Sequence, residues 1–389
     1  MRSSSGSSWP KSASPRPNRP AKEARSSDPR SRPPRHPIMA GMPSHRPGFA
    51  VTVILMAALA PIAFTASQNP TRSPLPATIR IPVTVLDKET GAPYPRLNRE
   101  RFQILEDGVR RPITGFVSAE ERTSVVILLE ASRRLYWVYP GDARSLMETL
   151  TASLASSFGV LLDAADYLAL VSFDARPRVW VDFTSTGRPL QQALTTLRER
   201  ALPRPSSNLY DALLFLLDGG TDDRGTEYKG MPEIGGKTAI ILMATGLDTA
   251  SRASAQEVWH RLERAGVPVH VIGLIELIYQ RLESFASSSA LLSVARAVRT
   301  LRTIAERSGG RFVELTTEGQ LPSALHFIAN ALGGQYVLEV ALNPSGHRPG
   351  KRTIDVLIDV DGDGHPDNAR LTLSYPGVIH VPESEAPRR

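Results

Sequence analysis

The chain has 389 residues, 41% of them apolar, which is enough for about two globular domains. It contains no cysteine, which excludes disulfides, thiol catalysis and lipid attachment through a cysteine. The formal net charge of +7 belongs to the N-terminus: residues 1–67 hold ten of the 46 basic and two of the 39 acidic residues. The remainder has a net charge of −1, so we expect no nucleic acid among its partners.

The N-terminal part of the sequence predicts an exported protein. Residues 1–46 are rich in Ser, Pro and Arg and are expected to be a disordered basic leader, or to lie upstream of a true start at Met39 or Met42. Residues 47–67 contain an apolar run followed by small residues, which is typical of a signal peptide or an N-terminal anchor. We therefore expect a periplasmic or extracellular location, with membrane contact only if this segment stays uncleaved.

The following residues alternate between strand and helix patterns. Residues 78–118 contain three candidate strands, and residues 335–376 contain three more. Between them, in 121–333, apolar strands alternate with amphipathic helices, which predicts a doubly wound, mostly parallel α/β sheet. Because the two ends of such a domain usually lie close together, the N- and C-terminal strands are expected to form one small flanking β unit. Residues 382–389 are expected to be a polar tail.

The strand at Val125–Leu129 is the centre of the predicted sheet. Its continuous aliphatic run is typical of a strand covered on both faces. The strand is followed directly by Glu130-Ala131-Ser132, at the end where open α/β sheets place their ligands. The sequence therefore predicts a binding site in this loop.

Several segments together resemble a known family. They are TSVVILLEASRR (123–134), the β region 83–116, SSNLYDALL (206–214), LRTIAERSGGRF (301–312) and QYVLEV (335–340). In this order they are similar to the von Willebrand factor type A (VWA) domain, and in particular to the bacterial VWFA-related proteins, which carry a short β region before the domain. The resemblance covers most of residues 78–376.

The resemblance implies a degenerate metal-ion-dependent adhesion site. In the family, the first loop reads Asp-x-Ser-x-Ser and coordinates a divalent cation together with hydroxyl and carboxylate ligands from two further loops. The matching positions in this chain are Glu130, Ser132 and Arg134 in the first loop, Ser207 in the second and Thr245 in the third.

Three of these positions depart from the family pattern. Glu130 and Thr245 stand where the family has aspartates, and Arg134 stands where it has a serine. Because a guanidinium is always charged, Arg134 is expected to take the space of the ion, pair with Glu130 and contact an acidic partner. Metal dependence is therefore predicted to be weakened or lost; if an ion binds, it is Mg²⁺ or Ca²⁺, with Asp248 as a replacement ligand.

A second candidate metal site lies near the C-terminus. The stretch DVDGDGHPD places Asp359, Asp361, Asp363 and Asp367 at the spacing of a calcium loop, with Gly364 in its sixth position. The twelfth position is occupied by Arg370, where such a loop has a glutamate. The alternative is a polar hairpin turn, since Asp and Gly are also the residues that turns require.

No catalytic constellation accompanies these sites. The sequence has no His-Glu-x-x-His zinc motif and no Gly-x-Ser-x-Gly elbow. The buried-strand residue His270 is expected to be a core residue. We therefore expect a non-catalytic protein-binding or adhesion module that engages a protein or cell-envelope partner, and as the alternative a structural cell-envelope protein with an inert site.

Overall fold

The computed structural model describes residues 78–94, 96–139, 141–199, 203–282, 288–342 and 350–381. Contacts divide the chain into two units, Met1–Asn69 and Pro70–Arg389, and the described residues all belong to the second. The predicted leader, the predicted signal peptide or anchor and the predicted tail lie outside the described residues. Among the helices that are described, none has both the length and the apolar character needed to cross a membrane.

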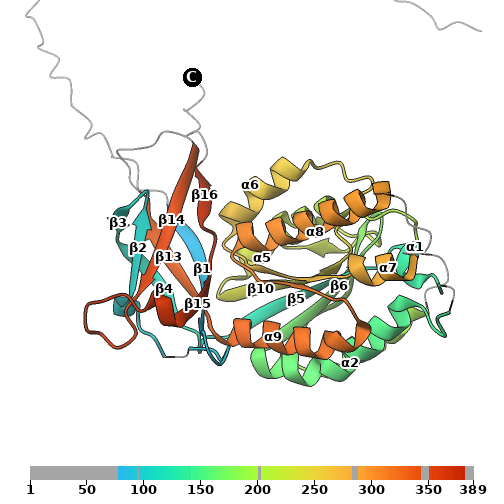
Figure 1. The fold of residues 1–389 in the computed structure, drawn as a ribbon, viewed down its shortest axis with the longest axis horizontal. Helices are drawn as coiled ribbons and strands as arrows, with labels where there is room; N and C mark the ends of the chain where they lie inside the picture. The colour runs from blue at the N-terminus through green and yellow to red at the C-terminus, as the bar shows by residue number, and fades with distance from the viewer. Residues whose placement is uncertain are drawn as a thin grey trace, which may run out of the picture. The chain divides into compact units, whose positions relative to one another are not determined.

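A six-stranded sheet forms the centre of the α/β domain (Figure 1). Its strands run in the order β12-β11-β10-β5-β6-β7 and are parallel, except that β7 is antiparallel to β6. Their bounds are β5 (Thr123–Glu130), β6 (Tyr167–Phe173), β7 (Pro177–Thr184), β10 (Lys237–Ala244), β11 (Val269–Gly273) and β12 (Phe312–Glu314).

Helices cover both faces of this sheet (Figure 1). One face packs against α1 (Arg133–Tyr136), α2 (Leu146–Ala164), α3 (Gly187–Arg198), α7 (Ile275–Leu282) and α9 (Leu321–Gly333). The other packs against α4 (Leu209–Asp218), α5 (Met231–Ile234), α6 (Ala255–Ala265) and α8 (Ser288–Ser308).

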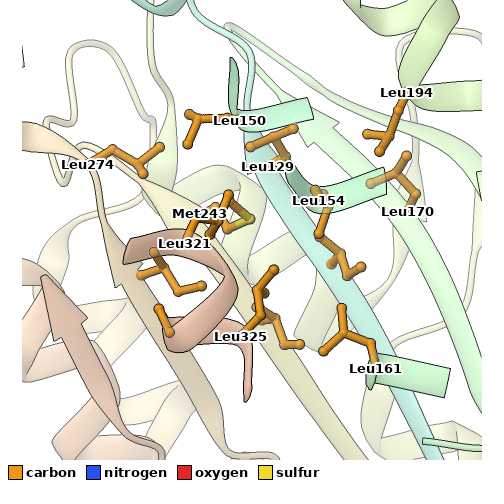
Figure 2. Packing of buried hydrophobic residues seen from close by; sticks show 14 of the residues in the cluster. Leu129, Leu150, Leu154, Leu161, Leu170, Leu194, Met243, Leu274, Leu321 and Leu325 are labelled. Carbon is orange, nitrogen blue, oxygen red and sulfur yellow. The ribbon is translucent and has the colours of Figure 1, made fainter. Parts of the chain in front are cut away.

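The central strand shows why the sheet needs two helical layers. Ile127 and Leu129 of β5 belong to one apolar cluster, whereas Val126 and Leu128 belong to the other, and all four side chains are fully buried. Figure 2 shows the first cluster, where leucines of α2 and α9 meet β5 and β10. The prediction of a doubly wound, mostly parallel sheet is confirmed.

The N- and C-terminal strands form two antiparallel four-stranded sheets, in the orders β15-β1-β13-β4 and β16-β14-β2-β3. Side chains from both sheets share one apolar cluster, so the two sheets pack as a small sandwich. The strand bounds are β1 (Thr78–Asp87), β2 (Phe102–Glu106), β3 (Val109–Arg111), β4 (Ile113–Val117), β13 (Gln335–Ala341), β14 (Gly350–Ile358), β15 (Leu371–Ser374) and β16 (Val378–Val381).

This arrangement confirms a flanking β unit built from both ends of the chain, and it corrects two details. Residues 109–111 form an additional short strand, β3, which belongs to a different sheet from β4. The turn between β2 and β3 places Asp107 and Gly108 at positive φ (49° and 77°), as a two-residue hairpin turn requires. Strand β16 was not predicted; it pairs with β14 at the edge of its sheet.

The β unit contacts the α/β domain at the start of β10. The side chain of Lys237 donates a hydrogen bond to the carbonyl of Ala119, and Gln335 Nε2 donates to the carbonyl of Thr238 over 3.2 Å. Arg80 donates to the carbonyl of Gly236 over 2.6 Å. Because β10 begins here, the carboxyl ends of the parallel strands lie at the opposite edge of the sheet.

Two segments between the main elements contain further regular structure. Residues 219–236 contain the two-stranded ribbon β8 (Gly220–Thr221) and β9 (Glu227–Tyr228), followed by α5. The segment is held because Asp222 is buried and accepts hydrogen bonds from the amides of Arg224 and Thr226. Residues 276–282 belong to α7, and residues 288–290 begin α8.

Candidate functional site

The predicted site lies where β5 and β10 end. The backbone leaves β5 at Glu130, and the amide of Ala131 donates to the carbonyl of Phe173 at the end of β6 over 2.7 Å. The loop after β10 begins at Thr245. The loop before α4, which holds Ser207, bonds to the β10 loop through Thr249. Three loops therefore meet at the carboxyl edge of the sheet.

Glu130 links two of these loops through its carboxylate. Ser132 Oγ donates to Glu130 Oε1 over 2.6 Å. Both the amide and the hydroxyl of Thr245 donate to Glu130 Oε2, each over 2.8 Å. Glu130, Ser132 and Thr245 are fully buried. The extra methylene of Glu130 over aspartate thus lets one carboxylate connect β5 to the β10 loop directly.

Arg134 provides the positive charge beside this carboxylate. Arg134 follows Glu130 by four residues, its Nε lies 3.8 Å from Glu130 Oε1, and its side chain is 21% exposed. The pair is therefore buried at its acidic end and reaches solvent at its basic end. The predicted pairing of Arg134 with Glu130 is present in this geometry.

Ser207 lies in the adjacent loop and is fully buried, but its hydroxyl has no hydrogen-bond partner among the described residues. Its backbone is tied to the β10 loop instead: the amide donates to Thr249 Oγ1 over 2.8 Å, and the Thr249 hydroxyl donates back to the Ser207 carbonyl over 3.3 Å. Ser207 therefore contributes to joining the loops through its main chain.

Asp248 makes its hydrogen bonds elsewhere. Its carboxylate accepts from the Ser251 hydroxyl over 2.5 Å and from the amide of Tyr210, in the first turn of α4, over 3.3 Å. Asp211 accepts from the amides of Arg252 and Ala253. Both aspartates thus fasten α4 to the β10 loop, and among the described residues neither forms a hydrogen bond with Glu130.

The residues present do not fit a divalent cation as the family site does. Magnesium requires several oxygen ligands in near-octahedral geometry. Both Glu130 oxygens already accept hydrogen bonds from the chain's own donors, and the charge of Glu130 is balanced by Arg134. A divalent ion at this point would lie beside a guanidinium with a single carboxylate to compensate it. The buried Ser207 hydroxyl is the feature that favours an additional ligand.

The second candidate site is an exposed turn. One carboxylate oxygen each from Asp359, Asp361 and Asp363 lies within 4.8 Å of the other two. Asp359 accepts hydrogen bonds from the amides of Gly362 (2.6 Å) and Gly364 (2.9 Å), which closes the turn. The structure thus brings three of the four predicted ligands together.

The fourth predicted ligand, Asp367, makes a different set of contacts. It accepts from the amide of Val360 over 2.9 Å and pairs with Arg370. The hydrogen bond from Val360, followed by that from Arg370, keeps the pKa of Asp367 below its ordinary value. Arg370 Nη2 also lies 3.3 Å from Asp361 Oδ2. Calcium binding by this loop stays a prediction.

The Arg281 cluster at the carboxyl edge was not predicted, whereas the expected core position of His270, near the start of β11, is confirmed. Arg281 of α7 pairs with Asp142, in the loop before α2, and with Glu318, after β12. These residues line a hollow of about 430 Å³. His270 is fully buried; its Nδ1 accepts from the amide of Arg311 over 3.2 Å, whereas Nε2 has no partner among the described residues. Nothing in the residue spacing indicates the Arg281 cluster, because its members come from three distant segments.

A doubly wound sheet with polar loops converging at the carboxyl ends of adjacent parallel strands places the chain in the class of open α/β domains, in which ligand sites occur at this edge. Residues 124–324, just over half of the chain, match the von Willebrand factor type A domain, and the chain belongs to this family. The predicted resemblance is confirmed at the level of the VWA domain. No curated protein matches the chain.

Solved structures with a similar fold come from several bacteria. The PilB minor pilin of Streptococcus sanguinis is 14% identical, with 57% of this chain and 63% of that chain covered and a TM-score of 0.39. The von Willebrand factor domain of the type V pili tip protein Mfa5 from Porphyromonas gingivalis is 14% identical (54% and 94% covered, TM-score 0.36). BatB from Bacteroides thetaiotaomicron is 14% identical (53% and 98% covered, TM-score 0.34). This chain thus spans less than two thirds of the PilB chain.

Proposed function

We propose that this chain is an exported, non-catalytic binding module that engages a protein or cell-envelope partner through the carboxyl edge of its parallel sheet. Membership of the VWA family supports a binding role, and the convergence of three polar loops at this edge supports its location. The β unit contacts the start of β10, at the other end of the strands, and leaves these loops uncovered by it.

In this proposal the contact with the partner does not require a metal ion. The observation that carries it is the ion pair between Arg134 and the buried Glu130, over 3.8 Å. The positive charge that a divalent cation supplies in the family is here part of the chain. Because the Arg134 side chain is 21% exposed, its guanidinium has donors left for a carboxylate of the partner.

The proposal is tested by partner capture with the full chain. Immobilised protein is incubated with a cell-envelope extract and washed with or without EDTA and at low or high salt. We expect capture that persists in EDTA, weakens in salt and falls in Arg134→Gln. Arg110→Gln, an exposed arginine of β3, is the matched control.

Two outcomes would contradict the proposal in different ways. Capture lost in EDTA would show that a bound cation mediates the contact. Capture that is unaffected by Arg134→Gln and by other changes at the carboxyl edge would favour a structural envelope protein whose ancestral site is inert.

A further inference from the structure

A polar hollow of about 670 Å³ lies next to the loops of the candidate site. Its walls come from the turn between β6 and β7, the start and end of α4, the β10–α6 loop and the ribbon strand β8. Carboxylate, amide and guanidinium groups, which are planar and can form hydrogen bonds in pairs, line much of it. They belong to Arg176, Asn208, Asp211, Asp218, Asp222 and Arg252. We call this site the mixed hollow.

Two carboxylates of the mixed hollow are fixed in place by the backbone. Asp211 accepts hydrogen bonds from the amides of Arg252 and Ala253, each over 3.0 Å. Asp222 accepts from the amide of Thr226 over 2.8 Å and is buried. Because these donors are neutral, both carboxylates keep their negative charge, and a carboxylate that can accept about four hydrogen bonds has capacity left. The mixed hollow therefore holds preorganised acceptors.

Two cations of the same hollow are not used inside the chain. Arg176 and Arg252 have exposed side chains, and neither forms an ion pair or a side-chain hydrogen bond with any described residue. Asp218, by contrast, pairs with Arg261. Free guanidiniums and fixed carboxylates thus line one site without neutralising each other. A ligand with a net charge of either sign meets repulsion there as well as attraction.

The side chain of Asn208 lacks one hydrogen bond at the wall formed by α4. The residue is 8% exposed, and its Nδ2 donates to the carbonyl of Ala250 over 2.9 Å. Its Oδ1 has no partner among the described residues. A shielded amide oxygen without a donor costs free energy. This wall of the mixed hollow therefore favours a ligand that brings a hydrogen-bond donor.

Phe215 adds a small apolar contact to the same hollow. Its ring is 7% exposed and packs on Tyr228, with the ring centroids 5.2 Å apart, which fixes its orientation. Gly220, which also lines the hollow, has a φ of 143°. A Cβ at this glycine would lie 3.5 Å from Phe215 Cδ2, so the absence of a side chain leaves the edge of the ring uncovered by residue 220.

We propose that the mixed hollow binds an uncharged saccharide. Neighbouring hydroxyl groups of a sugar are donors and acceptors at once, so they serve fixed carboxylates, free guanidiniums and the Asn208 oxygen without bringing a net charge. A zwitterion would match both signs, but it would give up the hydration of two full charges for exposed ion pairs of little net value. The volume lies within the range of sites for small organic molecules.

This inference goes beyond the proposed function, because Arg134 does not line the mixed hollow. It assigns a second site with its own ligand, formed in part by the loop before α4 and the β10–α6 loop. The two proposals can therefore fail separately.

The experiment is an NMR titration of the full chain with four neutral trisaccharides that differ in their hydroxyl arrangement: maltotriose, cellotriose, mannotriose and chitotriose. We expect at least one to bind with a dissociation constant of about 1 mM or tighter. Arg176→Gln/Arg252→Gln should weaken this binding about tenfold or more, because each change removes charged donors. Both side chains are exposed and unpaired, so the thermal midpoint should stay unchanged. Arg110→Gln is the matched control, and Arg134→Gln should bind like the parent chain.

Each other outcome overturns the inference. No binding by any of the four trisaccharides, or equal binding by the double variant, would contradict it. Tighter binding of triglycine or of trigalacturonate, lost in the same double variant, would assign the mixed hollow to a peptide or to an anion. Saccharide binding lost in Arg134→Gln would place the ligand at the Glu130 site instead. Partner capture that depends on Arg134 keeps the proposed function intact in the first three cases.

Discussion

The two acidic sites of this chain place similar ligands in opposite surroundings. At the edge of the α/β sheet, Glu130 is fully buried, and its charge is balanced by Arg134 and by three hydrogen bonds. In the turn after β14, Asp361 and Asp363 are exposed to water, which solvates their charge. A buried carboxylate needs a compensating group inside the protein, whereas an exposed one does not. The need for a metal therefore depends on whether another group already compensates the charge.

The largest expected difference between the two sites is in stability. Glu130→Ala removes the acceptor for Ser132 and Thr245 and leaves Arg134 unpaired, so we expect the free energy of unfolding to fall by about 3–5 kcal/mol. Asp361→Ala in the exposed turn should leave the urea midpoint nearly unchanged. Equal losses for the two variants would show that Glu130 is not the structural link inferred from its contacts.

A second effect concerns the response to acid. Burial, and then the charge of Arg311, lowers the pKa of His270 to about 3 in the folded chain. An unfolded histidine titrates near 6.5, so between pH 6.5 and about 3 the unfolded state binds a proton that the folded state does not. Stability should therefore fall as pH falls through this window, by about 3 kcal/mol at pH 4.

A variant of His270 tests whether this core residue, rather than either acidic site, causes the loss of stability in acid. His270→Asn should flatten the dependence of the urea midpoint on pH between 4 and 7. A slope that persists in His270→Asn would instead assign the acid sensitivity to carboxylates, and Glu130→Gln and Asp367→Asn would then show which site is responsible.

The comparison also predicts that a metal site can be restored at the buried position. The triple variant Glu130→Asp/Arg134→Ser/Thr245→Asp removes the internal cation and returns two aspartates and a serine to the places where the family has them. Calorimetric titration with Mn²⁺ should show binding at least about tenfold tighter than in the parent chain. Asp361→Ala/Asp363→Ala is included in both backgrounds to silence the exposed turn, and no gain in affinity would show that the loops have lost the required geometry.

The smallest expected effect is calcium binding to the parent chain. If the exposed turn binds Ca²⁺, its incomplete ligand set should give a dissociation constant in the weak range of about 10⁻⁴–10⁻³ M. Asp361→Ala/Asp363→Ala should abolish the calorimetric signal, and Ser132→Ala should not change it. A signal that depends on Ser132 would reverse the assignment of the two sites.

The α/β fold was predictable because its signals are local and repeated. The apolar run of β5 and the helix patterns after each strand define the doubly wound sheet without any long-range information. The division of residues 109–117 between two sheets was not predictable. Nothing in the residues around Pro112 indicates that β3 and β4 pair with strands of different sheets.

The candidate site was predictable in its members and only partly in its contacts. Sequence order placed Glu130 and Thr245 at the same edge, and the charge of Arg134 indicated its pairing. Sequence alone did not indicate that Asp248 accepts a hydrogen bond from the amide of Tyr210 at the start of α4. The exposure of Trp137 could not be predicted either, because it depends on the burial of Leu135 and Tyr139 on either side.

The pairing of β1 with β13 has a consequence for the order of events during synthesis. Thr84 is aligned with Gln335, so the first strand of the sandwich leaves the ribosome long before its neighbour exists. At usual elongation rates this delay is about 10–50 s. During it, the apolar residues of β1 have no sheet to join, whereas the α/β domain has all its strands once β12 is made. Folding of that domain then brings the two ends of the chain together and shortens the loop that the sandwich must close. The α/β domain, inserted between β1 and β13, thereby lowers the entropic cost of forming the sandwich.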